Sequence, residues 1–290
     1  MRRSDGGLAM KLMFVGPAIF LLLAMNIFPL LYDVWLSFTN ADLSGGDTQM
    51  VNGANYEILF SDDRYDQAIG TTAKFVLLAV GLELVLGFVL ALAMKDKMPA
   101  KPVVLTLLLI PMMLCPVVLS LFWNLILNGN YGVLNQALAF VGLPQPQWLT
   151  DNDLKFLSVL LIDVWMWTPF MMLIALAGLS AIPKYIYEAA EIDGAGPWQR
   201  FMAVTLPGIR NTVIFVATIT TFGAFRLFDV VFVLTRGGPL GSTNTVIMEL
   251  YEVGYVRSLI GRSSAIAVVF FITVIAVTLM QRRILREEAS

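Results

Sequence analysis

Four ionisable side chains interrupt otherwise apolar stretches of this chain: Glu83, Asp163, Arg226 and Asp229. A charged group at the centre of a membrane-spanning helix costs about 2.5–3.5 kcal/mol on insertion scales, so such groups normally face protein or a water-filled cavity. The chemistry they offer is hydrogen bonding and charge pairing. We therefore treat them as candidates for contact with a polar solute.

Two of these groups admit two interpretations, and a third has aromatic neighbours. Arg226 and Asp229 lie three residues apart on one predicted helix face, so they either neutralise each other or contact a solute. Asp163 is followed by Trp165 and Trp167, and a carboxylate beside aromatic rings suits the hydroxyls and ring faces of a sugar. Tryptophans near a span also serve as packing or interfacial anchors. The predicted substrate pathway comprises Asp163, Trp165, Trp167, Arg226 and Asp229.

Several kinds of catalytic chemistry are missing from the sequence. The chain has no His and a single cysteine, Cys115, which removes the usual zinc sites, His-based triads, CxxC redox pairs and disulfides. It has no GxxxxGK[ST] phosphate loop, so any ATP must be handled by another polypeptide. The net charge of −2 gives no indication of a basic surface that binds nucleic acid. We expect that this chain binds no metal and no cofactor and has no enzymatic activity.

The composition places the chain in a membrane. Of its 290 residues, 58% are apolar and 14% charged, and the mean hydropathy is +0.78. These values are too apolar and too charge-poor for a soluble domain of this size. The chain is therefore predicted to be an integral membrane protein, with lipid among its partners.

The predicted fold is all-α, with six membrane spans in a single transmembrane domain over 1–290. A bilayer core of roughly 30 Å needs about 20 helical residues. The first apolar stretch is too long for a signal peptide and has no A-x-A-like cleavage site, so a retained span is expected. In the third, Pro111 and Pro116 are expected to kink the helix. The spans are predicted at about 12–35, 72–94, 103–127, 156–182, 212–234 and 263–280.

The orientation follows from the distribution of Lys and Arg, which concentrate on the cytoplasmic side of membrane proteins. Six basic residues lie on one side of the predicted spans: Arg64, Lys74, Lys155, Arg236, Arg257 and Arg262. Both termini and the loop at 183–211 are therefore predicted to be cytoplasmic, because the other side carries twelve: Arg2, Arg3, Lys11, Lys95, Lys97, Lys101, Lys184, Arg200, Arg210, Arg282, Arg283 and Arg286.

The loop at 183–211 is polar but prone to form helices. Pro183 suits a first helical turn, and the run from Gly194 to Pro197 should end that helix. A second helix is expected from Pro197 until Pro207 interrupts it. The sequence thus predicts two short helices at an angle.

Within this loop, Glu188-Ala189-Ala190 is followed after three residues by Gly194, after nine more by Val204, and after one more by Leu206-Pro207. This spacing resembles the EAA motif of membrane-spanning permease subunits of binding-protein-dependent ABC importers, with Val204 where the family often has Ile. The resemblance implies a cytoplasmic coupling helix that docks in a cleft of the ATP-hydrolysing subunit. An interfacial hairpin lying on the membrane is the alternative. The docking residues implied by the resemblance are Glu188, Ala189, Ala190, Gly194, Leu206 and Pro207.

A second signature follows the fifth predicted span. Phe228-Asp229 precedes Leu234-Thr235-Arg236-Gly237-Gly238-Pro239, with Ser242-Thr243 and Tyr251 beyond it. This run resembles the T-x-GGP turn of the sugar-importing branch of these permeases. Two glycines and a proline also favour a tight turn on physical grounds. The turn residues are Thr235, Gly237, Gly238 and Pro239.

The resemblance implies a permease subunit of a type I ABC importer in the inner membrane, carrying a carbohydrate or polyol by alternating access. The implied partners are a second similar permease, two copies of an ATPase that bind Mg-ATP, and an extracytoplasmic solute-binding protein. Within the family, an importer of glycerol-phosphate or another anion is the alternative, with Arg226 as the attracting residue. A secondary transporter driven by an ion gradient is the alternative of another class.

Overall fold

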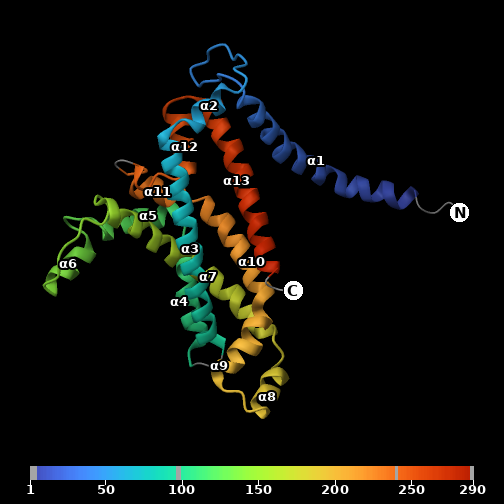
Figure 1. Cartoon of the computed structure of the whole chain (residues 1–290), viewed down its shortest axis with the longest axis vertical. Coiled ribbons are helices and arrows are strands. Elements are labelled where there is room, and N and C mark those ends of the chain that lie inside the picture. The colour runs from blue at the N-terminus through green and yellow to red at the C-terminus, as the bar shows by residue number, and fades with distance from the viewer. Residues whose placement is uncertain (1–4, 96–98, 239–240, 288–290) are drawn as a thin grey trace. The chain divides into compact units, whose positions relative to one another are not determined.

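The computed structural model describes residues 5–95, 99–238 and 241–287, and the regular elements in these ranges are helices (Figure 1). The predicted all-α fold is thereby confirmed for the described residues. Backbone contacts group the chain into two compact units, Met1–Asp63 with Leu250–Ile272 and Arg64–Glu249 with Thr273–Ser290. Their boundaries fall at the start of α3 (Asp63–Lys95), inside α12 (Val246–Tyr251) and inside α13 (Ile260–Glu287).

The first unit holds a polar loop against the beginning of α13. It contains α1 (Asp5–Leu36), α2 (Ala54–Phe60), the π-helical turn η3 (Glu252–Val256) and the first part of α13. Asn55 of α2 donates from Nδ2 to the carbonyls of Ser37 and Thr39 at 2.9 and 2.8 Å. Ser264 of α13 donates from Oγ to Asp33 Oδ1 of α1 at 2.6 Å. These bonds satisfy buried polar groups near the end of α1 and the start of α13.

The second unit is built around α7 (Asn152–Ala181), which contacts α4, α10 and α11. Asp151 caps its N-terminus by accepting the N–H groups of Asp153 and Leu154 at 3.0 and 3.1 Å. The other helices of this unit are α3, α4 (Lys101–Met113), α5 (Pro116–Ile126), α6 (Val133–Phe140), α8 (Lys184–Ile192), α9 (Pro197–Arg200), η1 (Phe201–Thr205), α10 (Leu206–Phe225) and α11 (Asp229–Leu234).

A small-residue contact brings α3 and α7 close together. A Cβ placed on Gly87 of α3 would lie 2.5 Å from the Cβ of Met171 and 3.0 Å from the backbone nitrogen of Met172. Membrane helices pack through such small residues because lipid offers no hydrophobic drive for association. The buried core beside this contact contains Ala91, Met94, Met172, Ala175, Leu179 and Ile209.

Five helical stretches among the described residues are long and apolar enough to cross a membrane: Met13–Leu36, Asp63–Lys95, Asn152–Ala181, Pro197–Leu234 and Ile260–Arg283. The bent pair α4 and α5 makes a sixth if the two count as one span. The chain therefore has the multi-span character that its composition indicates.

The third predicted span differs from expectation, because the helix breaks rather than kinks. α4 ends at Met113, α5 begins at Pro116, and the two are bent by 97°. Cys115 adopts an extended conformation, as the residue before a proline tends to do. Pro111, by contrast, stays inside α4. Only Pro116 ends a helix, because its ring disfavours a helical conformation in the preceding residue.

Candidate functional site

The EAA-like loop (183–211) presents an exposed helix. None of the residues of α8 is buried. Its apolar side chains Tyr185 and Ile192 are 68% and 85% exposed, and Glu188 and Ala189 are also exposed. Figure 1 shows α8 and α9 together at one end of the long helices α3, α7 and α10. An exposed, partly apolar helix at this place can accept a protein partner or lie against lipid headgroups.

Gly194 ends α8 in a left-handed conformation, with φ of +77°. The N–H of Gly194 donates to the Glu191 carbonyl at 3.0 Å, and the N–H of Ala195 donates to the Ala190 carbonyl at 2.9 Å. This pair of bonds is the Schellman motif, which satisfies the last carbonyls of a helix. The glycine is needed for its backbone conformation rather than for space, since nothing lies within 4 Å of the position a Cβ would take.

The second half of the loop corrects the prediction of two short helices. α9 begins at Pro197, where Gln199 Oε1 accepts the Gly196 N–H at 2.8 Å, and the chain stays helical through η1 into α10. Pro207 does not interrupt it. The N–H of Leu206 donates to the carbonyl of Phe201, a π-helical bond, and Pro207 follows as the second residue of α10. A proline is tolerated there because the turn is already rearranged around its missing N–H.

Three contacts connect the arms of this loop to each other and to α3. Tyr187 OH and Thr205 Oγ1 are 3.0 Å apart, and Lys95 Nζ of α3 lies 3.8 Å from the centre of the Tyr187 ring. Arg200 and Glu191 form an exposed ion pair at 3.3 Å. Tyr187 therefore links α8 to Thr205, the residue before α10, and to the end of α3.

A cavity of about 260 Å³, which we call the polar cavity after its side chains Glu83, Asp163 and Arg226, lies between α3, α7 and the C-terminal part of α10. Glu83 and Asp163 line it and are 2% and 4% exposed. Trp167 and Arg226 also line it, so three of the five predicted pathway residues share one site. The remaining lining residues are Phe170, Ile219, Thr220, Phe222, Gly223 and Ala224.

The other two predicted pathway residues lie elsewhere. Trp165 packs edge-on against Trp123 of α5 with ring centres 5.5 Å apart, and Asp229 begins α11. α10 ends before Arg226, so Arg226 and Asp229 do not share a helix face, and they form no ion pair within the described residues. The structure therefore does not support mutual neutralisation, one of the two interpretations, which assumed a continuous helix across the break.

Sequence reasoning noted Glu83 but did not assign it to the pathway, and it missed Phe170. The signal for Phe170 was present, because Asp163, Trp167 and Phe170 are spaced i, i+4 and i+7 on one helix face. For Glu83 there was no such signal. Its place in the cavity depends on the packing of α3 against α7.

The turn after α11 is tight. Gly237 and Gly238 have φ of +83° and +68°, and Gly238 donates its N–H to the Thr235 carbonyl at 2.7 Å. The hydroxyls of Thr235 and Thr243 are 2.8 Å apart, which closes the turn. Pro239, the last predicted residue of the turn, lies outside the described residues.

These features define the chain as a helical, multi-span membrane protein with an exposed loop helix and a polar cavity among its long helices. It belongs to the family described as the binding-protein-dependent transport system inner membrane component, which matches residues 83–287. The chain is therefore a permease subunit, as the EAA-like spacing indicates.

One relative in sequence and two solved structures align with nearly the whole length of this chain. The chain is 31% identical over 272 residues to the trehalose/maltose transport system permease protein MalF of Thermococcus litoralis, covering 94% of this chain and 92% of the relative. It shares its fold with a chain of a bacterial ABC transporter involved in the import of the acidic polysaccharide alginate, with a TM-score of 0.85, 18% identity and coverage of 97% and 98%. A chain of the bacterial alginate ABC transporter in complex with an alginate pentasaccharide-bound periplasmic protein gives a TM-score of 0.82 at 19% identity, with coverage of 92% and 91%.

Proposed function

We propose that this chain is one of two permease subunits of an ATP-driven importer for a neutral sugar or polyol. Its partners are a second permease, two copies of a cytoplasmic ATPase and an extracytoplasmic binding protein. The observation that carries the substrate class is the full-length similarity to a permease whose name specifies trehalose and maltose. Both termini and the EAA-like loop face the cytoplasm, as the distribution of basic residues supports.

The ATPase docks on α8. Glu188 and Ala189 are exposed on this helix, and its apolar side chains Tyr185 and Ile192 have no covering residues within the second unit. A partner with an apolar cleft and a basic or polar rim would bury both kinds of group. Gly194, Leu206 and Pro207 contribute by ending α8 and by forming the exposed start of α10, rather than by charge.

The solute passes through the polar cavity. Asp163, Glu83 and Arg226 offer acceptors and donors for hydroxyls, and Trp167 offers an aromatic face. Similarity to the trehalose/maltose permease supports a neutral solute over glycerol-phosphate, for which Arg226 would be the attracting residue.

Alternating access supplies the mechanism. Closure of the ATPase pair on ATP moves α8, and the contacts of Tyr187 with Thr205 and Lys95 pass that movement to α10 and α3. α3 and α10 both line the polar cavity, so the movement changes the access to Glu83 and Arg226. ATP hydrolysis takes place on the partner, and this chain has no catalytic residue.

Reconstituted transport tests the proposal. The chain is co-purified with its partner ATPase and second permease, and the complex is placed in liposomes with the binding protein outside and ATP on the ATPase side. We expect uptake of labelled trehalose or maltose that requires ATP and the binding protein. Glycerol 3-phosphate should not compete. Uptake that runs on an ion gradient without ATP would contradict the proposal.

A further inference from the structure

A second polar recess, which we call the α3–α7 cleft, lies apart from the polar cavity. It has a volume of about 620 Å³ and is lined by Gln67, Gly70, Thr71, Lys74, Asn152, Asp153, Phe156 and Ser242. None of these residues lines the polar cavity. The volume lies within the range of about 300–1,000 Å³ typical of small-molecule sites.

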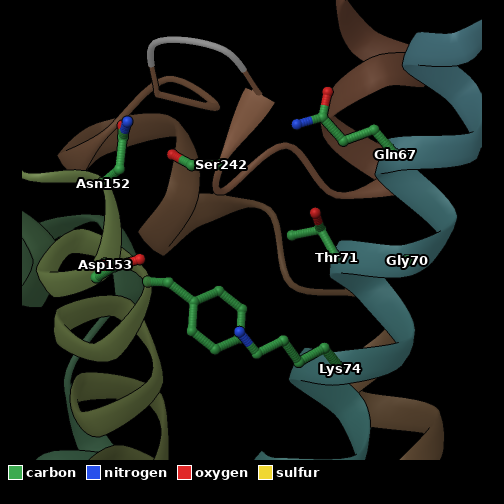
Figure 2. A pocket seen from close by; sticks show the side chains of 8 residues that line it. Gln67, Gly70, Thr71, Lys74, Asn152, Asp153 and Ser242 are labelled. Atoms are coloured by element: carbon green, nitrogen blue, oxygen red, sulfur yellow. The ribbon is translucent and has the colours of Figure 1, made fainter.

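Figure 2 shows how the walls face each other: Gln67, Thr71 and Lys74 project from α3, Asn152 and Asp153 stand on α7, and Ser242 lies on the segment after α11. Two contacts hold the walls in place. Lys74 Nζ of α3 lies 4.6 Å from the centre of the Phe156 ring on α7, a cation–π contact. The Gln67 amide lies against Gly241, where a Cβ would come within 2.8 Å of Gln67 Oε1.

One polar group of the cleft has no hydrogen-bond partner among the described residues. Ser242 Oγ is buried and makes no hydrogen bond among the described residues. An unsatisfied buried hydroxyl costs free energy, which a ligand hydroxyl can recover. The other lining groups are of the same kind, since Thr71 offers a hydroxyl and Asn152 an amide.

The charges of the cleft are balanced, which bears on the class of ligand. Lys74 provides one positive charge and Asp153 one negative charge. The N-terminus of α7 does not offer an anion site, because Asp151 already accepts the N–H groups of Asp153 and Leu154. An anion entering the cleft would meet Asp153, and a cation would meet Lys74. A neutral ligand with many hydroxyls avoids both penalties.

We propose that the α3–α7 cleft binds a neutral sugar at the extracytoplasmic mouth of the permease, as a second site distinct from the polar cavity. This inference rests on the proposed function for the identity of the solute and for the side of the membrane. The cleft is then the first binding site in the permease. Its hydroxyl and amide groups hold a solute that has left the binding protein before the solute reaches Glu83 and Asp163.

Site-directed cysteine protection tests the proposal on the assembled complex. In a Cys115→Ala background, Thr71→Cys and Asn152→Cys place one thiol on each wall, and Asp66→Cys places a control thiol on α3 outside the lining residues. Assembly is checked by size-exclusion chromatography. The probes are trehalose and maltose without binding protein, and labelling uses an impermeant maleimide.

At a sugar concentration of about ten times its dissociation constant for the cleft, labelling of both wall thiols should slow about tenfold, because about one site in eleven is then empty. Asp66→Cys should be labelled at an unchanged rate.

The outcomes are distinct. Protection of the wall thiols, or of Asn152→Cys alone should Thr71→Cys fail to assemble, supports the sugar site. Labelling that sugar leaves unchanged overturns it. Protection by sugar-free binding protein instead of sugar overturns it and makes the cleft a protein contact, and stronger protection by glycerol 3-phosphate makes it an anion site. If the complex transports these sugars while the thiols are unprotected, only this inference fails; absence of ATP-driven sugar uptake contradicts the proposed function itself.

Discussion

Glu83 of α3 and Asp163 of α7 are both buried and line the same cavity together with Arg226. Ionisable groups buried in an apolar bundle are costly, so they are normally kept for a function. Their shared cavity gives the strongest basis for assigning a solute path in this permease.

Asp163→Asn should lower the maximal rate of ATP-driven sugar uptake, because a hydrogen bond from a solute hydroxyl to a charged acceptor contributes about 1.5–3 kcal/mol and an amide retains only part of it. Sugar binding by the isolated binding protein should not change. Asp229→Asn is the matched control, since Asp229 begins α11 and does not line the cavity. An equal loss of uptake rate in both variants would show that the cavity does not lie on the solute path.

Glu188→Lys should release the ATPase from the purified complex. Removing one partner of a desolvated charged pair costs about 2–5 kcal/mol, and charge reversal adds repulsion. A helix-dipole effect alone would be about 0.3–1 kcal/mol and would leave the complex intact. The measurement is the ratio of ATPase to permease after affinity purification. Lys101→Glu, on α4, is the control and should retain the ATPase; a Glu188→Lys complex of normal composition and transport rate would refute the docking assignment.

Gly194→Val should uncouple transport from ATP hydrolysis while the permease still inserts. A β-branched residue at a φ of +77° is strained, so the Schellman end of α8 should distort. Uptake and ATP hydrolysis are measured in the same liposomes. Gly196→Ala is the control, because its φ of −65° suits any residue and a Cβ there would meet only Gln199 Oε1, at 3.7 Å. Disappearance of the permease from the membrane would indicate a folding role instead.

Cysteines introduced at Ser61 and Gly196 should label differently. In a Cys115→Ala background, Ser61→Cys should react with an impermeant thiol reagent added to intact cells, and Gly196→Cys should resist it until the membrane is opened. The expectation comes from the excess of basic residues on the side that carries the EAA-like loop. The reverse pattern would invert the topology.

Gly87→Ala should destabilise the permease, because its Cβ would press on Met171 and on the backbone of Met172. Overpacking of this kind costs about 1–3 kcal/mol. Gly81→Ala on the same helix has nothing within 4 Å and should leave the midpoint of thermal unfolding in detergent unchanged. Equal midpoints for the two variants would show that α3 and α7 are not in close contact at Gly87.

Local patterns determined much of this protein. The apolar runs indicate the long helices, and the EAA-like spacing indicates the family that the comparisons confirm. The glycine that ends α8 was also readable, because a left-handed residue after a helix is a local requirement. Such features depend on neighbouring residues along the chain, so periodicity and spacing are enough to detect them.

The tertiary structure decided the features that depend on contacts between residues distant in sequence. The sequence predicts kinks at Pro111 and Pro116 and a helix interruption at Pro207. Of these three prolines, only Pro116 separates two helices, while a π-helical turn lets the helix continue through Pro207 into α10. Membership of the polar cavity was readable only in part: Asp163 and Trp167 share a helix face, whereas Glu83 joins them through the packing of α3 against α7. Which face of a buried helix meets a cavity depends on the packing of helices distant in sequence, and an almost uniformly apolar span carries little periodic signal to reveal it.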